Sequence, residues 1–237
     1  MWPAGEICSA TTKGTIIDKT LSVCYNDGAM KVLYFDTETT GLYPAGNYVG
    51  GHMYPGQICQ LAYLVDDGGD LTAKNFYFAV EYIDPGATRV TGLTVPLVDS
   101  LSGGRVFADD VDEINRDFAE ADLVVAHNLS FDEKFMKVEM ARCGYQFDLS
   151  QKGWCSMKGF TPILRLPGTR NLYKYPSLAE LAAYWGVDDA TVRTNMQTLY
   201  RIDRDAHDAR HDTVKMYLAI QRAIPQVEGL KYLFGKE

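Results

Sequence analysis

The clearest β-strand pattern in the sequence is Lys31-Val32-Leu33-Tyr34-Phe35-Asp36, and a second acid, Glu38, follows it after one threonine. Side chains of an extended chain alternate between two faces, so Asp36 and Glu38 share one face at the end of the strand. Two neighbouring carboxylates repel each other unless a cation lies between them, and oxygen ligands suit a divalent metal ion. The pair therefore suggests a metal site, although an exposed acidic strand end would contain the same two residues.

Alternating elements follow this strand. Segments 57–66 and 74–83 are rich in β-branched and aromatic residues, and the turn residues between them predict an antiparallel pair. Apolar spacing and capping residues predict the remaining elements, which are helices at 108–122, 130–143, 177–186 and 209–223 and a buried strand at 123–126. This order predicts an α/β fold with a mixed β-sheet and helices on both faces.

The composition is that of a globular protein. Of the 237 residues 46% are hydrophobic and 23% are charged, which excludes a disordered chain. No apolar run approaches the ~20 residues of a membrane span, and residues 1–29 lack the apolar stretch of a secretory signal, so we expect a cytoplasmic protein. The five cysteines are odd in number and no two have CxxC spacing, which favours reduced thiols over disulfides or a zinc cluster.

Polarity and net charge vary along the chain. Residues 1–29 are polar and could form a β-hairpin, so we expect an N-terminal extension at 1–29 and one enzymatic domain at 30–237. Residues 1–133 carry a net charge of −13, whereas residues 134–215 carry +4. This distribution could place a carboxylate site beside a phosphate-binding surface, but two solvated faces are the simpler explanation of charge alone.

Two more acids and a histidine stand in suggestive positions. Asp132 falls in the first turn of the helix after the strand at 123–126, and it reaches the same sheet edge as the acidic pair if that strand lies beside the first. Asp212 lies on the last helix, five residues after His207, and the two can face one site if His207 lies in the preceding loop. The adjacent His211 projects about 100° away from Asp212. When each residue is considered alone, Asp132 is explained by helix capping and His207 by a surface position.

Three segments, taken in chain order, resemble the motifs of the DnaQ-like 3'–5' exonuclease superfamily in its DEDDh branch. They are Phe35-Asp36-Thr37-Glu38-Thr39-Thr40-Gly41-Leu42, His127-Asn128-Leu129-Ser130-Phe131-Asp132 and His207-x-Ala209-x-x-Asp212, with weaker matches at 58–62, 90–94 and 177–181. The resemblance covers about residues 31–224. Segments 43–56 and 187–206 are longer than is typical of the family, and residues 1–29 have no counterpart in it.

The resemblance implies an RNase H-like fold and hydrolysis of phosphodiesters with two divalent metal ions, Mg²⁺ or Mn²⁺. It implies that His207 is the general base that takes a proton from the attacking water. The catalytic carboxylates that would hold the ions are Asp36, Glu38, Asp132 and Asp212.

Contacts with the substrate are implied as well. By the resemblance, the backbone at Thr39 and Thr40 meets the terminal 3'-hydroxyl, and Leu42 wedges against the terminal base, although core packing is an equal alternative for Leu42. Asn128 and His127 could contact a phosphate, but capping of the following helix by Asn128 or Ser130 explains this segment equally well. Candidate contacts with backbone phosphates are basic residues of the second half, Lys134, Lys137, Arg165, Arg170 and Arg210.

The favoured function is a metal-dependent 3'–5' exonuclease that releases nucleoside 5'-monophosphates from single-stranded DNA. Thr39 makes the first motif more similar to proofreading-type DNA exonucleases than to oligoribonucleases. An exoribonuclease or oligonucleotide-degrading enzyme of the same family, a non-catalytic nucleic-acid-binding module and a phosphohydrolase of small nucleotides are the alternatives. The expected partner is nucleic acid, DNA rather than RNA. A DNA polymerase acting in trans is a further candidate, and no membrane partner is expected.

Overall fold

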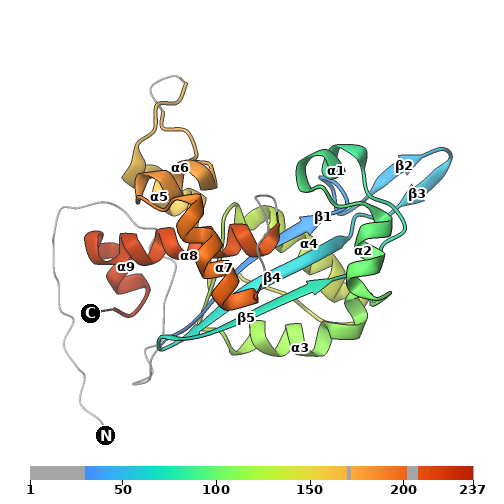
Figure 1. Ribbon diagram of the computed structural model, residues 1–237, viewed down its shortest axis with the longest axis horizontal. Helices are drawn as coiled ribbons and strands as arrows, with labels where there is room; N and C mark the ends of the chain where they lie inside the picture. Colours follow the sequence, from blue (N-terminus) through green and yellow to red (C-terminus); the bar gives the residue numbers. More distant parts are fainter. Residues whose placement is uncertain (1–29, 170–171, 202–207, 237) are drawn as a thin grey trace, which may run out of the picture.

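The central sheet is mixed, as expected. The structure is a computed structural model that describes residues 30–169, 172–201 and 208–236. Five strands lie in the order β5-β4-β1-β6-β7 (Figure 1). The first three along the chain pair antiparallel, whereas β6 and β7 run parallel to β1. This order with these directions is that of an RNase H-like fold. The strands are β1 (Lys31–Thr39), β4 (Ile58–Asp67), β5 (Asp70–Tyr77), β6 (Leu123–Ala126) and β7 (Gly153–Cys155).

Side chains of β1 alternate between two cores. Val32 and Tyr34 pack into the cluster that includes α8, whereas Leu33 and Phe35 pack on the opposite face. All four are at most 4% exposed, which explains why this strand is a nearly continuous apolar run. The first face is covered by α5 (Ser156–Leu164), α6 (Leu178–Tyr184), α7 (Asp189–Tyr200), α8 (Ala209–Ala223), the 3-10 turn η1 (Ile224–Gln226) and α9 (Glu228–Leu233). The second face is covered by α3 (Phe107–Glu120) and α4 (Leu129–Arg142).

Most of the expected elements are confirmed. The helix at 209–223 has the predicted bounds, and α6 begins with the capping pair Ser177 and Glu180. The strand expected at 74–83 is wrong in its bounds, because β5 starts at Asp70, directly after the glycine turn, and ends at Tyr77. Beyond β5 the chain leaves the sheet and forms two short helices, α1 (Pro85–Thr91) and α2 (Val95–Ser102), which pack against Cys59 and Tyr77.

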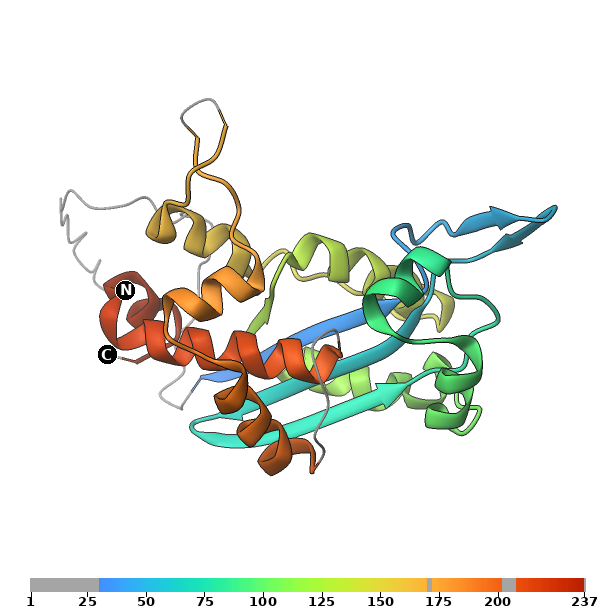
Figure 2. The ribbon, with the colours of Figure 1, turned by 45° about the horizontal axis from the view of Figure 1, so that its top comes forward.

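The two long segments contain structure that the sequence patterns did not indicate. Residues 43–56 include a separate hairpin, β2 (Asn47–Val49) and β3 (His52–Tyr54), which projects from the body of the molecule (Figure 2). Its turn is Gly50-Gly51, and both residues have positive φ, which glycine adopts without a steric penalty. The segment 187–206 forms α7 as far as Tyr200, and residues 202–207 lie outside the described residues.

The expected N-terminal extension at 1–29 lies outside the described residues, and so do Cys8 and Cys24. Within the described part of the chain, Cys59 is buried, Cys143 and Cys155 are partly buried, and all three are free thiols. None of the helices in the described residues combines the length and the apolar character needed to cross a membrane.

Candidate active site

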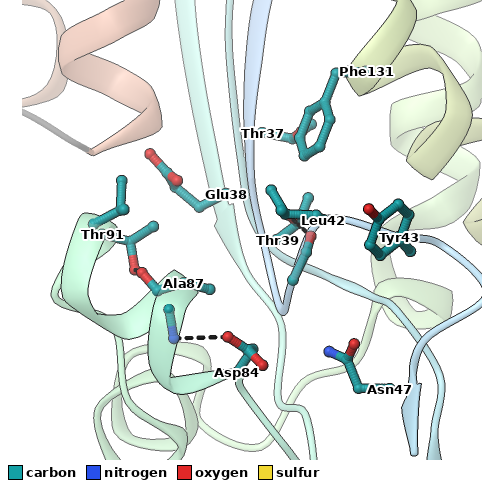
Figure 3. A pocket seen from close by; sticks show the side chains of 13 residues that line it. Thr37, Glu38, Thr39, Leu42, Tyr43, Asn47, Asp84, Ala87, Thr91 and Phe131 are labelled. Carbon is teal, nitrogen blue, oxygen red and sulfur yellow. Dashed lines mark hydrogen bonds between the residues drawn. The ribbon is translucent and has the colours of Figure 1, made fainter.

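The acidic pair lies at the carboxyl end of β1. Asp36 and Glu38 are half-buried and lie on the same side of the strand as Val32 and Tyr34. Thr37, which lies between them on the other side, is buried. Figure 3 shows the side chain of Glu38 pointing away from β1, toward the side on which Thr91 of α1 lies. The sheet edge therefore presents two acids that are partly shielded from solvent.

Asp132 reaches this edge from α4. The parallel pairing of β6 with β1 matches Val125 with Tyr34, so β6 ends beside β1 shortly before Asp36, and α4 starts three residues after β6. The Asp132 carboxylate is 2% exposed and accepts hydrogen bonds from the backbone N–H of Thr37 (3.2 Å) and from its hydroxyl (2.7 Å). Its Oδ1 atom is thus fixed to the residue between Asp36 and Glu38.

Electrostatics show that the four acids lie close together. Burial, and then the charges of Asp132 and Asp212, hold the pKa of Asp36 well above its usual range. Burial raises the pKa of Glu38 to about 9, with further contributions from Asp212, Asp208 and Asp132. Burial raises the pKa of Asp132 to about 7, against the lowering effect of its Thr37 hydrogen bonds. Asp36, Glu38 and Asp132 therefore lie in a region of low dielectric, and neighbouring carboxylates oppose the ionisation of Asp36 and Glu38.

A divalent cation fits this donor set. Carboxylate oxygens are hard ligands, and a cation between them would remove the repulsion that raises their pKa values. Within the described residues, however, no three histidine, cysteine or acidic side chains stand at the spacing of a bound metal ion. The acids are gathered at one place, but their side chains are not arranged as a finished ligand set.

Comparison with known proteins agrees with this geometry. The DNA polymerase III epsilon subunits of Salmonella typhimurium and Salmonella typhi are each 30% identical over 169 residues. In sequence the chain is thus similar to these exonuclease-type polymerase subunits. The alignment covers 67% of this chain and 61% of each relative, so the chain spans less than two thirds of their length.

Two further similarities are weaker in sequence identity or in coverage. The PolC-type DNA polymerase III of Streptococcus suis is 27% identical over 143 residues, which is 56% of this chain and 9% of that protein. The apo Pan2 pseudoubiquitin hydrolase–RNA exonuclease module of Saccharomyces cerevisiae aligns over 88% of this chain and 32% of its own, with 14% identity and a TM-score of 0.49. No family model matches the sequence.

A cavity of about 540 Å³ adjoins the acidic pair at Glu38. Glu38 and Thr39 line it from β1, Phe131 from α4, and Thr91 from α1 (Figure 3). Its other lining residues are Thr37, Gly41, Leu42, Tyr43, Asn47, Asp84, Gly86, Ala87 and Val90. Its mixed lining and its position beside Glu38 suit a nucleoside-sized group.

The predicted substrate contacts fall into two groups. Thr39 and Thr40 are buried and shape the turn after β1, because the Thr39 hydroxyl donates to the Gly41 carbonyl (2.8 Å) and the Thr40 hydroxyl accepts from the Gln57 N–H (2.9 Å). Leu42 is 72% exposed at the cavity, so the core-packing alternative is wrong. Asn128 is exposed, has φ of 68° and makes no capping hydrogen bond with its side chain, so the capping alternative is also wrong for Asn128.

His207 lies outside the described residues, so its expected role stays a prediction. The residues that follow it are firmly held. Asp208 accepts a hydrogen bond from Gln60 Nε2 (2.9 Å) and pairs with the guanidinium of Arg210 through Nε (2.7 Å) and Nη2 (2.5 Å). Arg210 also donates to the Tyr77 hydroxyl (2.8 Å) and lies over the Tyr77 ring. This network, Gln60–Tyr77–Asp208–Arg210, fixes the start of α8 to β4 and β5.

Arg210 is therefore not a phosphate contact. Its side chain is buried and its charge is matched by Asp208, so the expectation of an exposed cation here is wrong. His211, one residue on, is 2% exposed, with Nδ1 3.1 Å from Asp212 Oδ1. No sequence pattern indicated this network. The available signal was Asp208 followed by Arg210 at a helix start, which by itself fits ordinary capping.

The raised pKa values predict that the metal-free protein loses stability as the pH rises. In the unfolded chain carboxyl groups titrate near pH ~4, so between this value and the folded pKa the native state binds more protons than the unfolded state. Stability from Glu38, whose pKa is about 9, is present at low pH and is lost as the pH rises toward 9. In EDTA we expect the Tm to fall between pH 6.5 and 8.5, and the fall to be smaller in Glu38→Gln. Equal pH slopes for wild type and Glu38→Gln in differential scanning calorimetry would contradict the shared acidic environment.

Proposed function

We propose that the chain is a metal-dependent 3'–5' exonuclease that hydrolyses single-stranded DNA and releases nucleoside 5'-monophosphates. The observation that carries the proposal is the convergence of Asp36, Glu38, Asp132 and Asp212 from β1, α4 and α8. Burial and neighbouring carboxylates raise the pKa values of Asp36 and Glu38, and burial raises that of Asp132. The names of the relatives, which are DNA polymerase subunits, support DNA as the substrate. A polymerase is accordingly a candidate partner in trans.

The four carboxylates would hold two divalent ions, Mg²⁺ or Mn²⁺. When bound, the ions supply charge stabilisation for the attacking and leaving oxygens of an in-line displacement. Asp132 is held in place by Thr37, so its reorganisation on loading would be small. His207 would take the proton from the attacking water, because an imidazole titrates close to neutral pH. The domain at 30–237 would carry the whole site.

The cavity beside Glu38 would receive the terminal nucleoside of the substrate. Leu42 lies exposed at its edge, where its side chain can contact a base, and Thr39 presents backbone beside Glu38, where a terminal hydroxyl can bind. Asn128, which is exposed at the start of α4, would donate to a phosphate oxygen.

The proposal is tested with 5'-labelled single-stranded DNA and RNA of equal length. We expect a ladder of shortened DNA products with Mg²⁺, none with EDTA, and slower shortening of RNA. His207→Ala should lower the rate at least about a hundredfold, as loss of a general base does, whereas the control His52→Ala on exposed β3 should not. Release of phosphate from mononucleotides without polymer shortening would refute the exonuclease proposal, and full activity of His207→Ala would refute the role of this residue.

A further inference from the structure

Basic residues are concentrated in one part of this acidic chain. The net charge is −8, yet residues 149–179 contain five basic residues and no acidic one. Lys152 is turned inward, and its Nζ donates to the backbone carbonyls of Phe118, Ala119 and Ala121. In the described residues, Lys158 and Arg165 of this segment are exposed, and so is Lys174, whose Nζ forms an ion pair with Glu180 (2.5 Å). A local excess of positive charge in an acidic protein favours a polyanionic partner.

Exposed aromatic side chains lie in the same segment. Residues 165–169 and 172–176, here called the α5–α6 arm, project away from the body above α5 and α6 (Figures 1 and 2). In the arm Leu172 is 69% exposed, Tyr173 51% and Tyr175 59%. A bridge between Pro167 and Tyr173, and a hydrogen bond from the Lys174 N–H to the Leu166 carbonyl (3.1 Å), hold its two sides together. The aromatic rings are therefore presented on an ordered support.

The C-terminal end of the arm lies next to the candidate active site. Its last residue, Pro176, is buried, and its carbonyl oxygen lies 3.0 Å from Nε2 of His127. His127 directly follows β6, and its Nδ1 lies 3.0 Å from the hydroxyl of Ser156 at the start of α5. Burial lowers the pKa of His127, and the nearby Asp212 carboxylate opposes this effect. His127 thus connects the base of the arm to the region of the four acids.

We propose that the α5–α6 arm binds the single-stranded substrate upstream of the nucleotide in the cavity, with bases stacking on Tyr173 and Tyr175 and a phosphate meeting Arg165. This inference rests on the proposed exonuclease function. Exposed rings interleaved with basic residues are the surface that unpaired nucleic acid requires, because rings stack on bases of any sequence and cations neutralise phosphates. The connection to the acids through His127 favours the substrate strand over a protein partner as the occupant.

The test uses the double variant Tyr173→Ala/Tyr175→Ala of the full chain. Loss of two stacking contacts should lower kcat/KM for a 20-nucleotide strand roughly tenfold to a hundredfold. A dinucleotide and the p-nitrophenyl ester of thymidine 5'-monophosphate, which reach only the cavity, should be cleaved as by the wild type. The matched control is Tyr232→Ala, which removes a 63% exposed tyrosine from α9.

Two binding measurements separate the arm from the chemistry. In EDTA, fluorescence anisotropy of a labelled 20-nucleotide strand should show about tenfold weaker binding to the double variant, whatever its activity. Arg165→Gln should reduce the slope of log affinity against log salt by ~0.7, the value for one phosphate contact on a single strand.

The outcomes distinguish a failure of the arm proposal from a failure of the exonuclease function. Unchanged strand binding and unchanged cleavage of the 20-nucleotide strand by the double variant would overturn the arm proposal, and so would equal losses on the strand and on the ester. A wild-type chain that binds the strand but cleaves none of the substrates would overturn the exonuclease function and leave the arm as a nucleic-acid-binding surface.

Discussion

Replacement of Asp36 by asparagine is expected to abolish catalysis while making the metal-free protein more stable. Burial, and then the charges of Asp132, Asp212 and Glu38, hold the pKa of Asp36 well above its usual range. Loss of one carboxylate should weaken cation binding, and a loss of ~4 kcal/mol of transition-state stabilisation corresponds to about a thousandfold in rate. We therefore expect kcat/KM on single-stranded DNA to fall at least about a thousandfold.

The stability of Asp36→Asn should change in the opposite direction. Removing one of four mutually repelling charges favours the folded state when no cation is present, and each kcal/mol of relieved repulsion raises the Tm of a chain of this size by about 2–4 °C. The increase should be present at pH 8 in EDTA and should vanish with excess Mg²⁺. Calorimetry of Asp36→Asn and of the control Asp70→Asn, which changes an exposed residue at the start of β5, checks this. An unstable, inactive Asp36→Asn would indicate a structural role for Asp36 instead.

The second large effect is expected at Arg210. Arg210→Met removes the cation that balances buried Asp208, and an unpaired charge left in the interior costs about 3–5 kcal/mol. The Tm should fall by roughly 6–20 °C. The matched control is Lys231→Met, which breaks the exposed pair with Glu228 and should change stability by less than ~1 kcal/mol.

Arg210→Met and its partner Asp208→Asn together test whether the network acts as a unit. Each single variant loses the same ion pair. The double variant should therefore lose clearly less free energy of unfolding than the sum of the losses of the two single variants. Additive losses, or an Arg210→Met protein as stable as Lys231→Met, would contradict the buried pairing.

Local patterns predicted much of this molecule. The bounds of α8 follow from apolar spacing that ends before Pro225, and α6 starts at the capping pair Ser177 and Glu180. The gathering of Asp132 with the acidic pair followed from one topological condition, that β6 lies beside β1, and the parallel pairing of these strands meets it. Such features depend on residues close in sequence or on strand order, which patterning largely specifies.

Features that depend on distant contacts could not be predicted in this way. The sequence pattern around Arg210 is that of a surface cation on a helix. Its burial depends on contacts with residues more than 130 positions earlier, because Tyr77 accepts a hydrogen bond from Arg210 and Gln60 donates one to its partner Asp208. The β2–β3 hairpin is built from three-residue strands, which are too short to show alternation. Leu42 could equally have packed in the core, because exposure at a cavity is set by the surrounding elements. The role of His207 is still a prediction.

Titration of the metal-free protein with Mn²⁺ at pH 8 tests most directly whether the acids form one cation site. We predict saturable binding of two ions per wild-type chain, displaced by Mg²⁺, and loss of this binding in Asp36→Asn. The absence of saturable binding up to millimolar Mn²⁺, or equal binding by wild type and Asp36→Asn, would contradict the assignment of Asp36, Glu38, Asp132 and Asp212 to a shared metal centre.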